Sequence, residues 1–135
     1  MNANVRNWIA LVGRIALALI FITSGWSKIT HFDGAAAYMA NAGMTMIKPL
    51  LVLTIIIELG GGLLLALGWK ARWAALAFAI WIVPVSFVFH AFWSVAPDQA
   101  QLQYIQFMKN VSIFGGMLMV IAFGPGAFAL ERSRS

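Results

Sequence analysis

The stretch Tyr104–Gly126 reads YIQFMKNVSIFGGMLMVIAFGPG. It contains a predominantly apolar run of about twenty residues, which is the length that an α-helix needs to cross about 30 Å of hydrocarbon. The run stops at Gly-Pro-Gly, a combination that ends helices. The stretch therefore predicts a membrane-spanning helix over residues 104–124. Lys109 and Asn110 lie inside this run, and a lysine in hydrocarbon costs a few kcal/mol, so both side chains are expected to face a polar partner or a pocket.

The composition of the whole chain points to a membrane protein. Of the 135 residues, 62% are hydrophobic and only 10% are charged, whereas a soluble domain carries about 25% charged residues. The lipid bilayer is therefore the expected environment of most of the chain, and the length allows one compact domain. The nine lysines and arginines stand singly at the ends of apolar runs, which is typical of topology signals and not of a nucleic-acid surface. The absence of cysteine excludes disulfides, iron–sulfur clusters and thiolate metal sites.

Three further apolar runs of similar length precede the first stretch. Together the four runs predict membrane-spanning helices over residues 8–27, 48–69, 71–94 and 104–124. Pro84 lies inside the third run and is expected to kink it. Arg14 interrupts the first run, which favours an uncleaved membrane anchor over a secretory signal. The predicted fold class is all-α: a polytopic membrane four-helix bundle, with residues 1–135 in a single domain.

The distribution of basic residues predicts the orientation of this bundle. Five of them fall on one side of the membrane and two on the other. The larger group is Arg6, Lys70, Arg72, Arg132 and Arg134, and the smaller group is Lys28 and Lys48. By the positive-inside rule, both termini face the cytoplasm, and the connections over 28–48 and 94–103 face outward.

Glu58 is the polar residue that most needs an explanation. At about 1.5 Å per residue, it falls near the middle of the second span, between Arg14 and Lys109 in depth. A carboxylate at this depth must be paired, protonated or exposed to a wet cavity. We therefore predict an intramembrane polar network of Arg14, Glu58 and Lys109, in which one of the two cations pairs with Glu58. The alternative is that both cations extend their charged ends to the membrane surfaces.

A second group of polar residues lies near the predicted outer ends of the spans. His90, Lys109 and Asn110 fall at a similar depth, and Lys28 follows the end of the first span. These four residues are the predicted ligand-binding set, in an outward-facing pocket. The alternatives are an interfacial histidine and an asparagine that holds two helices together. No metal site is predicted, since His31 and His90 lack the spacing of metal ligands, and no catalytic motif is present.

Several short motifs occur in an order and spacing that resemble the DoxX family over residues 8–132. They are an arginine in the first span, SGWSK at its end, HFDGAAAYMANAG, ELGGGLLLALGWKAR, FHAFW, QFMKNVSIFGG and GPGAFALER. The resemblance implies a small bacterial inner-membrane protein with four helices. It also implies that certain positions recur in the family: Arg14, Gly25, Lys28, Glu58, Gly68, Arg72, Lys109 and Asn110. The family takes its name from a subunit of an archaeal quinone-linked thiosulfate oxidoreductase. This chain lacks a fused soluble or cysteine-bearing partner, which leaves enzymatic activity open.

The function expected from the residues and the resemblance is that of a quinone- or lipophile-binding accessory subunit in membrane redox or stress physiology. The expected partners are the lipid bilayer, a redox partner subunit and further copies of the chain, with quinone as the candidate cofactor. Two other functions stay open. One is a non-enzymatic membrane scaffold, and the other is a transporter of a small solute or proton that uses Glu58. The transporter is the weakest of the three, because no inverted repeat is detectable.

Overall fold

The computed structural model describes residues 1–131. Its helical elements, in chain order, are α1 (Ala3–Thr30), α2 (Phe32–Asn41), α3 (Ile47–Ile55), η1 (Ile56–Gly61), α4 (Gly62–Leu67), α5 (Ala71–Phe89) and α6 (Pro97–Phe123). The elements α3, η1 and α4 follow one another without a break and form one long helix. The prediction of an all-α fold is therefore confirmed.

Within residues 1–131, four helices are long and apolar enough to cross a membrane: Ala3–Thr30, Ile47–Leu67, Ala71–Phe89 and Pro97–Phe123. They correspond to the four predicted spans, although their ends differ. The first helix begins earlier because the side chain of Asn2 accepts a hydrogen bond from the N–H of Asn4 at 2.9 Å and caps it. The last helix begins earlier because Pro97 occupies its first turn, where the missing N–H is harmless.

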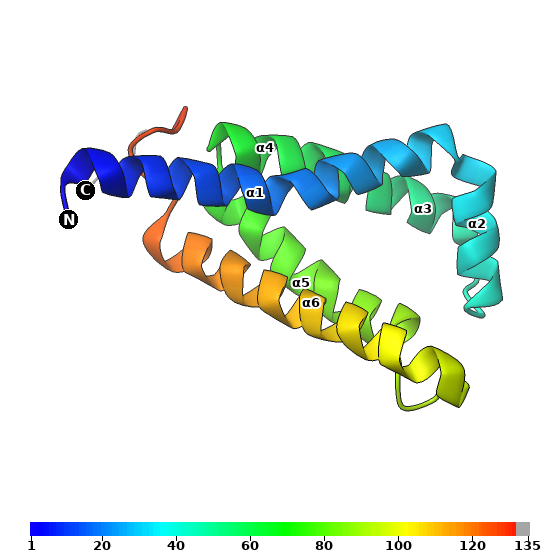
Figure 1. The fold of residues 1–135 in the computed structure, drawn as a ribbon. Coiled ribbons are helices and arrows are strands. Elements are labelled where there is room, and N and C mark those ends of the chain that lie inside the picture. The colour runs from blue at the N-terminus through cyan, green and yellow to red at the C-terminus, as the bar shows by residue number, and fades with distance from the viewer. Residues whose placement is uncertain (132–135) are drawn as a thin grey trace.

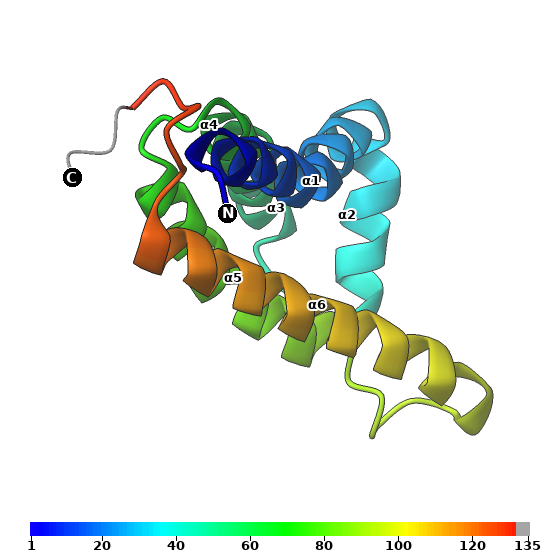
Figure 2. The ribbon, with the colours of Figure 1, turned by 60° about the vertical axis from the view of Figure 1, so that its left-hand side comes forward.

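The four spans form two pairs (Figure 1). Helix α1 lies beside the continuous helix α3–η1–α4, and α5 lies beside α6. The two pairs approach each other at the end of the bundle where Arg14 lies, which we call the Arg14 end. They diverge toward the opposite end, which carries α2 and the connection between α5 and α6 and which we call the α2 end (Figure 2). The molecule is therefore compact at one end and splayed at the other.

Helix α2 was not predicted, because residues 28–48 were treated as a loop. In the structure the segment FDGAAAYMAN is helical and buries Met39. It runs across the α2 end of the bundle at a steep angle to α1 (Figure 1). The segment therefore covers part of the splayed end.

The N-terminus and the segment 124–131 lie at the same end of the bundle (Figure 1). This arrangement agrees with the expectation that both termini share one side of the membrane, while the choice of the cytoplasmic side remains a prediction. Two of the basic residues on which that prediction depends, Arg132 and Arg134, lie outside the described residues.

Small residues allow α1 to pack closely against the second span. A Cβ added to Gly25 would lie 2.9 Å from the backbone nitrogen of Leu59, and one added to Gly62 would lie 2.8 Å from a side-chain carbon of Ile22. Such approaches are typical of helix contacts in membranes, where small residues let backbones come together. The core also includes several alanines of α5 around Phe78, whose ring stacks on Phe21 with 4.0 Å between the centroids.

The second span contains a π-helical turn, Ile56–Gly61, which carries Glu58. A π-turn inserts an extra residue into the α-helical repeat and is found mostly at functional sites. The turn follows directly on α3 and places the buried Glu58 side chain toward α1. The π-helical turn therefore coincides with the acidic residue of the second span.

Candidate functional site

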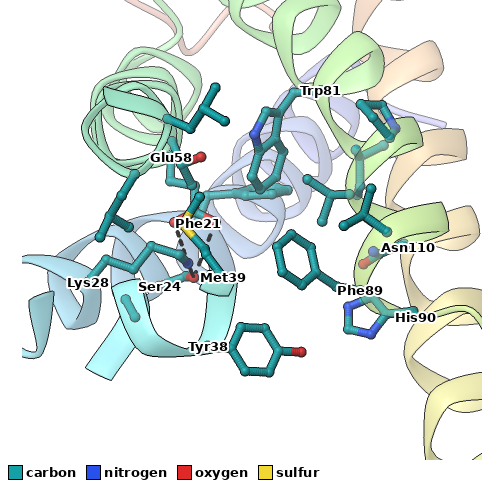
Figure 3. Close-up of a pocket in the computed structure, with 18 of the residues that line it drawn as sticks. Phe21, Ser24, Lys28, Tyr38, Met39, Glu58, Trp81, Phe89, His90 and Asn110 are labelled. Carbon is teal, nitrogen blue, oxygen red and sulfur yellow. Dashed lines mark hydrogen bonds and ion pairs between the residues drawn. The ribbon is translucent and has the colours of Figure 1, made fainter. Parts of the chain in front are cut away.

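The side chain of Glu58 is held by two residues of α1. The Nζ of Lys28 lies 2.8 Å from Glu58 Oε2 and also donates to Ser24 Oγ at 2.7 Å. Ser24 Oγ in turn donates to Glu58 Oε1 at 3.3 Å. Ser24 and Lys28 stand one helical turn apart, so both face the second span. Figure 3 shows the three side chains converging, with dashed lines between them.

The predicted partner of Glu58 was therefore wrong. Lys28 forms the ion pair, and neither Arg14 nor Lys109 does. Lysine side chains carry a long flexible stem, and the depth estimate placed Lys28 beyond the end of the first span, although α1 continues to Thr30. Lys109 instead donates to Gln106 on its own helix. Of the predicted polar network, Glu58 and Lys109 both line the cavity described below but form no ion pair with each other, and Arg14 does not line it.

Arg14 lies at the other end of the bundle, where it contacts backbone carbonyls. Its guanidinium donates to the carbonyl of Ala66 at 3.3 Å, to that of Phe128 at 2.8 Å and to that of Pro125. The residue is only 3% exposed. A planar guanidinium with five N–H donors suits such a set of acceptors. Arg14 therefore joins α1 to the end of α4 and to the segment that follows α6.

Lys109 and Asn110 are neighbours in sequence but have different environments. Lys109 is exposed and donates to Gln106 on its own helix. Asn110 is buried, and its Nδ2 donates to Ser86 Oγ at 3.0 Å, while Ser86 donates to the carbonyl of Ile82 at 2.7 Å. This chain of hydrogen bonds links α6 to α5, as expected for a polar residue that holds two membrane helices together.

His90 stands at the end of α5, and its Nδ1 lies 2.8 Å from Gln103 Oε1. Because an amide oxygen is an acceptor, Nδ1 is the nitrogen that carries the proton in the neutral ring. The other ring nitrogen, Nε2, is then an acceptor. Gln103 thus orients the imidazole and decides which hydrogen bond it can still make.

A cavity of about 460 Å³ lies between the two helix pairs at the α2 end. Its volume is within the range of about 300–1,000 Å³ that is common for small-molecule sites. The walls are mostly apolar, and they include the aromatic residues Phe21, Tyr38, Trp81 and Phe89. Figure 3 shows Glu58, Ser24 and Lys28 on one side and His90 and Asn110 on the other. The polar groups are therefore few and lie on opposite walls.

The four residues predicted to bind a ligand line this one cavity: Lys28, His90, Lys109 and Asn110. Their role in binding stays a prediction. Sequence reasoning did not identify Ser24, Tyr38 or Trp81 as parts of the site. Ser24 could have been found from its position one helical turn before Lys28. Aromatic residues in an apolar span have no comparable pattern that identifies them. Within residues 1–131, no group of three His, Asp or Glu side chains is arranged to hold a metal ion.

Comparisons with known proteins agree with the architecture. The DoxX family model matches residues 9–91, a range that includes Arg14, Lys28 and Glu58. The chain is 35% identical to the inner membrane protein YphA of Escherichia coli (strain K12), with 90% of this chain and 87% of that protein covered. It is 37% identical to the inner membrane protein YqjF of the same organism, with 90% and 88% covered.

More distant relatives are eukaryotic. The chain is 24% identical to the Surfeit locus protein 4 homolog of Drosophila melanogaster, with 96% of this chain but only 42% of that protein covered. No solved structure matches the chain.

Proposed function

Since the chain belongs to the DoxX family and is a multi-pass inner-membrane protein, we propose that its cavity binds a membrane lipophile of the quinone class. We further propose that the protein is an accessory subunit in membrane redox or stress physiology. The observation that carries the proposal is the position of the Lys28–Glu58 ion pair in the wall of a mostly apolar cavity. Ligand sites combine an apolar lining with a small number of placed polar groups.

The ion pair favours a neutral headgroup with a carbonyl oxygen. An ammonium group has three N–H donors, and Lys28 uses one for Ser24 and one for Glu58. One donor therefore remains for a ligand, and the side chain of Lys28 is 27% exposed while that of Glu58 is 5% exposed. Because Glu58 already neutralises the charge of Lys28, an anionic headgroup gains little from this pair, whereas a carbonyl gains a hydrogen bond.

The aromatic walls favour a flat ring. Phe21, Trp81 and Phe89 line the cavity, and Phe21 also contacts the ring of Trp81 edge-on at 6.2 Å between centroids. Aromatic rings pack in offset or edge-to-face arrangements that stabilise each pair by about 0.5–1.5 kcal/mol beyond the burial of area. A planar headgroup between these residues would make contacts of this kind.

The opposite wall can accept a hydrogen bond from the ligand. His90 presents Nε2 as an acceptor when Gln103 holds Nδ1–H. A carbonyl oxygen of an oxidised quinone would accept a hydrogen bond from Lys28, and a hydroxyl group of the reduced form would donate one to His90 Nε2. Lys28 thus suits either redox form, whereas His90 suits the reduced form.

In this function the chain binds the quinone, and a partner protein supplies the electrons. A quinone supplies reversible uptake of electrons and protons, which is chemistry of the bound group and not of the side chains. The residues of the cavity would hold and orient the ring. This division of roles agrees with the absence of cysteine from the chain.

The direct test is to purify the protein in mild detergent and to identify co-purifying lipophiles by mass spectrometry. We expect a quinone in stoichiometric amount. The variant Lys28→Met/Glu58→Met should fold, since removing both members of a buried pair leaves no unpaired charge, and it should lose the quinone. Lys48→Met is the matched control, because Lys48 is exposed and does not line the cavity, and it should keep the quinone.

Two results would contradict the proposal. One is the absence of any stoichiometric lipophile from the wild-type protein, also after incubation with a benzoquinone that carries a ten-carbon tail. This result would favour the scaffold function. The other is unchanged quinone content in the double variant, which would place the quinone elsewhere on the protein.

A further inference from the structure

Helices α3 and α5 both line the cavity but do not pack closely against each other, and we call the space between them the gap. No Cα of α3 lies within 8 Å of a Cα of α5, although η1 and α4 both approach α5 more closely than this. The second span therefore packs against α5 only along its half near the Arg14 end. Figure 1 shows the same divergence of the α5–α6 pair from α3.

The residues at the margins of this gap are apolar and half-exposed. On α3, Leu53 lines the cavity and is 51% exposed, and on α5, Val88 lines the cavity and is 46% exposed. Both helices belong to the set that is long and apolar enough to cross a membrane. Leu53 and Val88 thus lie within candidate membrane spans, and we expect lipid outside the gap.

An aromatic contact joins α2 to α5 beside the cavity. The ring of Tyr38 on α2 stacks on that of Phe89 on α5, with 5.3 Å between centroids and 15° between planes. No Cα of α2 lies within 8 Å of α5, so this stacking pair spans the space between the two helices. Figure 3 shows the two rings beside each other, and both residues line the cavity.

We propose that the ligand enters the cavity sideways from the bilayer, through the gap between α3 and α5, and that Tyr38 and Phe89 close the aqueous route. The ligand is then a lipophile dissolved in the membrane, with its polar head at Lys28 and Glu58 and its tail in the gap. This inference rests on the proposed binding function and adds the route to it. The volume of about 460 Å³ accommodates a headgroup of ordinary small-molecule size, and a long tail must therefore remain in the gap.

The absence of cysteine from the chain permits a test that does not depend on the identity of the ligand. Val85 lines the cavity, and Val85→Cys places a reporter thiol inside it. In the full-length protein in lipid nanodiscs, the thiol is treated either with a long-chain alkyl maleimide dissolved in the lipid or with a sulfonated, water-soluble thiol reagent. We expect the alkyl maleimide to react faster.

Narrowing the gap should slow this reaction selectively. Val88→Trp in the Val85→Cys background should reduce the labelling rate by the alkyl maleimide by about tenfold, a change of about 1.4 kcal/mol in the barrier. Val83→Trp is the matched control, since Val83 is also half-exposed on α5 but does not line the large cavity, and it should leave the rate unchanged. Tyr38→Ala should open the aqueous route and accelerate the sulfonated reagent.

The outcomes separate the route from the binding function. Faster labelling by the sulfonated reagent in the Val85→Cys protein would overturn the lateral route, and so would a rate that Val88→Trp leaves unchanged. Labelling by neither reagent, in a chain whose thiol reacts after denaturation, would also overturn it and would indicate that a second protein chain covers the gap. The labelling by the alkyl maleimide can also follow the expected pattern without being slowed by the ten-carbon benzoquinone. This result would support the route and contradict the quinone as the ligand.

Discussion

Two cations on the same helix, Arg14 and Lys28, show how differently the two ends of this bundle use a charge. Arg14 is buried and donates to the carbonyls of Ala66, Pro125 and Phe128. Lys28 pairs with Glu58 at the wall of a cavity and keeps part of its surface exposed. The difference lies in the partners. Backbone carbonyls tie chain segments together, whereas a side-chain pair beside an open space leaves hydrogen-bonding capacity for something else.

The Arg14 end is further closed by the segment after α6. The N–H of Leu130 donates to the carbonyl of Leu67, and that of Glu131 donates to the carbonyl of Gly68, both at 3.0 Å. Gly68 has a φ of 69°, and a Cβ there would lie 2.5 Å from the Cβ of Ala129. Chain segments therefore pack tightly around Gly68. The comparison predicts that substitutions at the Arg14 end change stability and that substitutions at the α2 end change binding.

The largest expected effect is all-or-none and concerns which side of the membrane each end faces. A reporter that is active only outside the cytoplasm should be inactive when fused after Ser135 and active when inserted near Gln99, because most of the basic residues lie on the side of the termini. Fusions of the same reporter in both positions provide the measurement. The reverse pattern of activity would place the cavity on the cytoplasmic side.

Loss of Arg14 should cause the largest change in stability. Arg14→Met leaves buried carbonyls without donors, each at a cost of about 1–3 kcal/mol, so we expect the free energy of unfolding to fall by roughly 3–5 kcal/mol. Thermal unfolding in detergent is the measurement, with the exposed Arg6→Met as the control. A loss no larger than that of the control would mean that the contacts of Arg14 contribute little, and the contrast between the two ends would disappear.

Glu58→Gln should have the next largest effect, because it leaves Lys28 without its partner. Breaking a fully buried pair costs about 3–5 kcal/mol, and the partial exposure of Lys28 should reduce this to roughly 1–3 kcal/mol. In a double-mutant cycle with Lys28→Met, we expect a coupling of about 1 kcal/mol or more.

The same cycle with Arg14→Met or Lys109→Met provides the control. The hydrogen bonds of both residues go to groups other than Glu58. Their effects on the free energy of unfolding should therefore add to that of Glu58→Gln within about 0.5 kcal/mol. Coupling with either of them, and none with Lys28, would restore the pairing expected from the sequence.

Gly25→Ala should destabilise the contact between α1 and the π-helical turn. The added Cβ would lie 2.9 Å from the backbone nitrogen of Leu59, and relief of such overpacking costs about 1–3 kcal/mol. The control is Gly13→Ala, which has nothing within 4 Å and should be neutral or stabilising by up to about 1 kcal/mol. Equal unfolding temperatures for the two variants would indicate that α1 can move away from the second span at no cost in free energy.

Lys109→Met should have the smallest effect on stability. The side chain is exposed and contacts only a residue of its own helix in the hydrogen-bond pattern, so the change should stay within about 0.5 kcal/mol. Because Lys109 also lines the cavity, the affinity for the ten-carbon benzoquinone should nevertheless fall, which a titration in nanodiscs can measure. A loss of folded protein without a separate loss of affinity would assign Lys109 to the structure and not to the site.

Several features of this protein follow from the sequence alone. The apolar runs have the length of membrane spans, and the few polar residues inside them stand out against that background. Glu58 was therefore identified as the residue that requires a partner, and Lys28, His90, Lys109 and Asn110 were grouped near one end. These inferences succeed because span length and helical depth depend on residues that are close together in the chain.

The tertiary structure decided which of these residues meet. Depth along the membrane normal suggested Arg14 or Lys109 as the partner of Glu58, but depth does not determine which helices are neighbours. The pairing of α1 with the second span brought Lys28 and Ser24 to Glu58, and the path of the segment after α6 gave Arg14 its carbonyl partners. The cavity likewise arises from the divergence of two helix pairs, which is a property of packing between distant segments and leaves no periodic trace in the sequence.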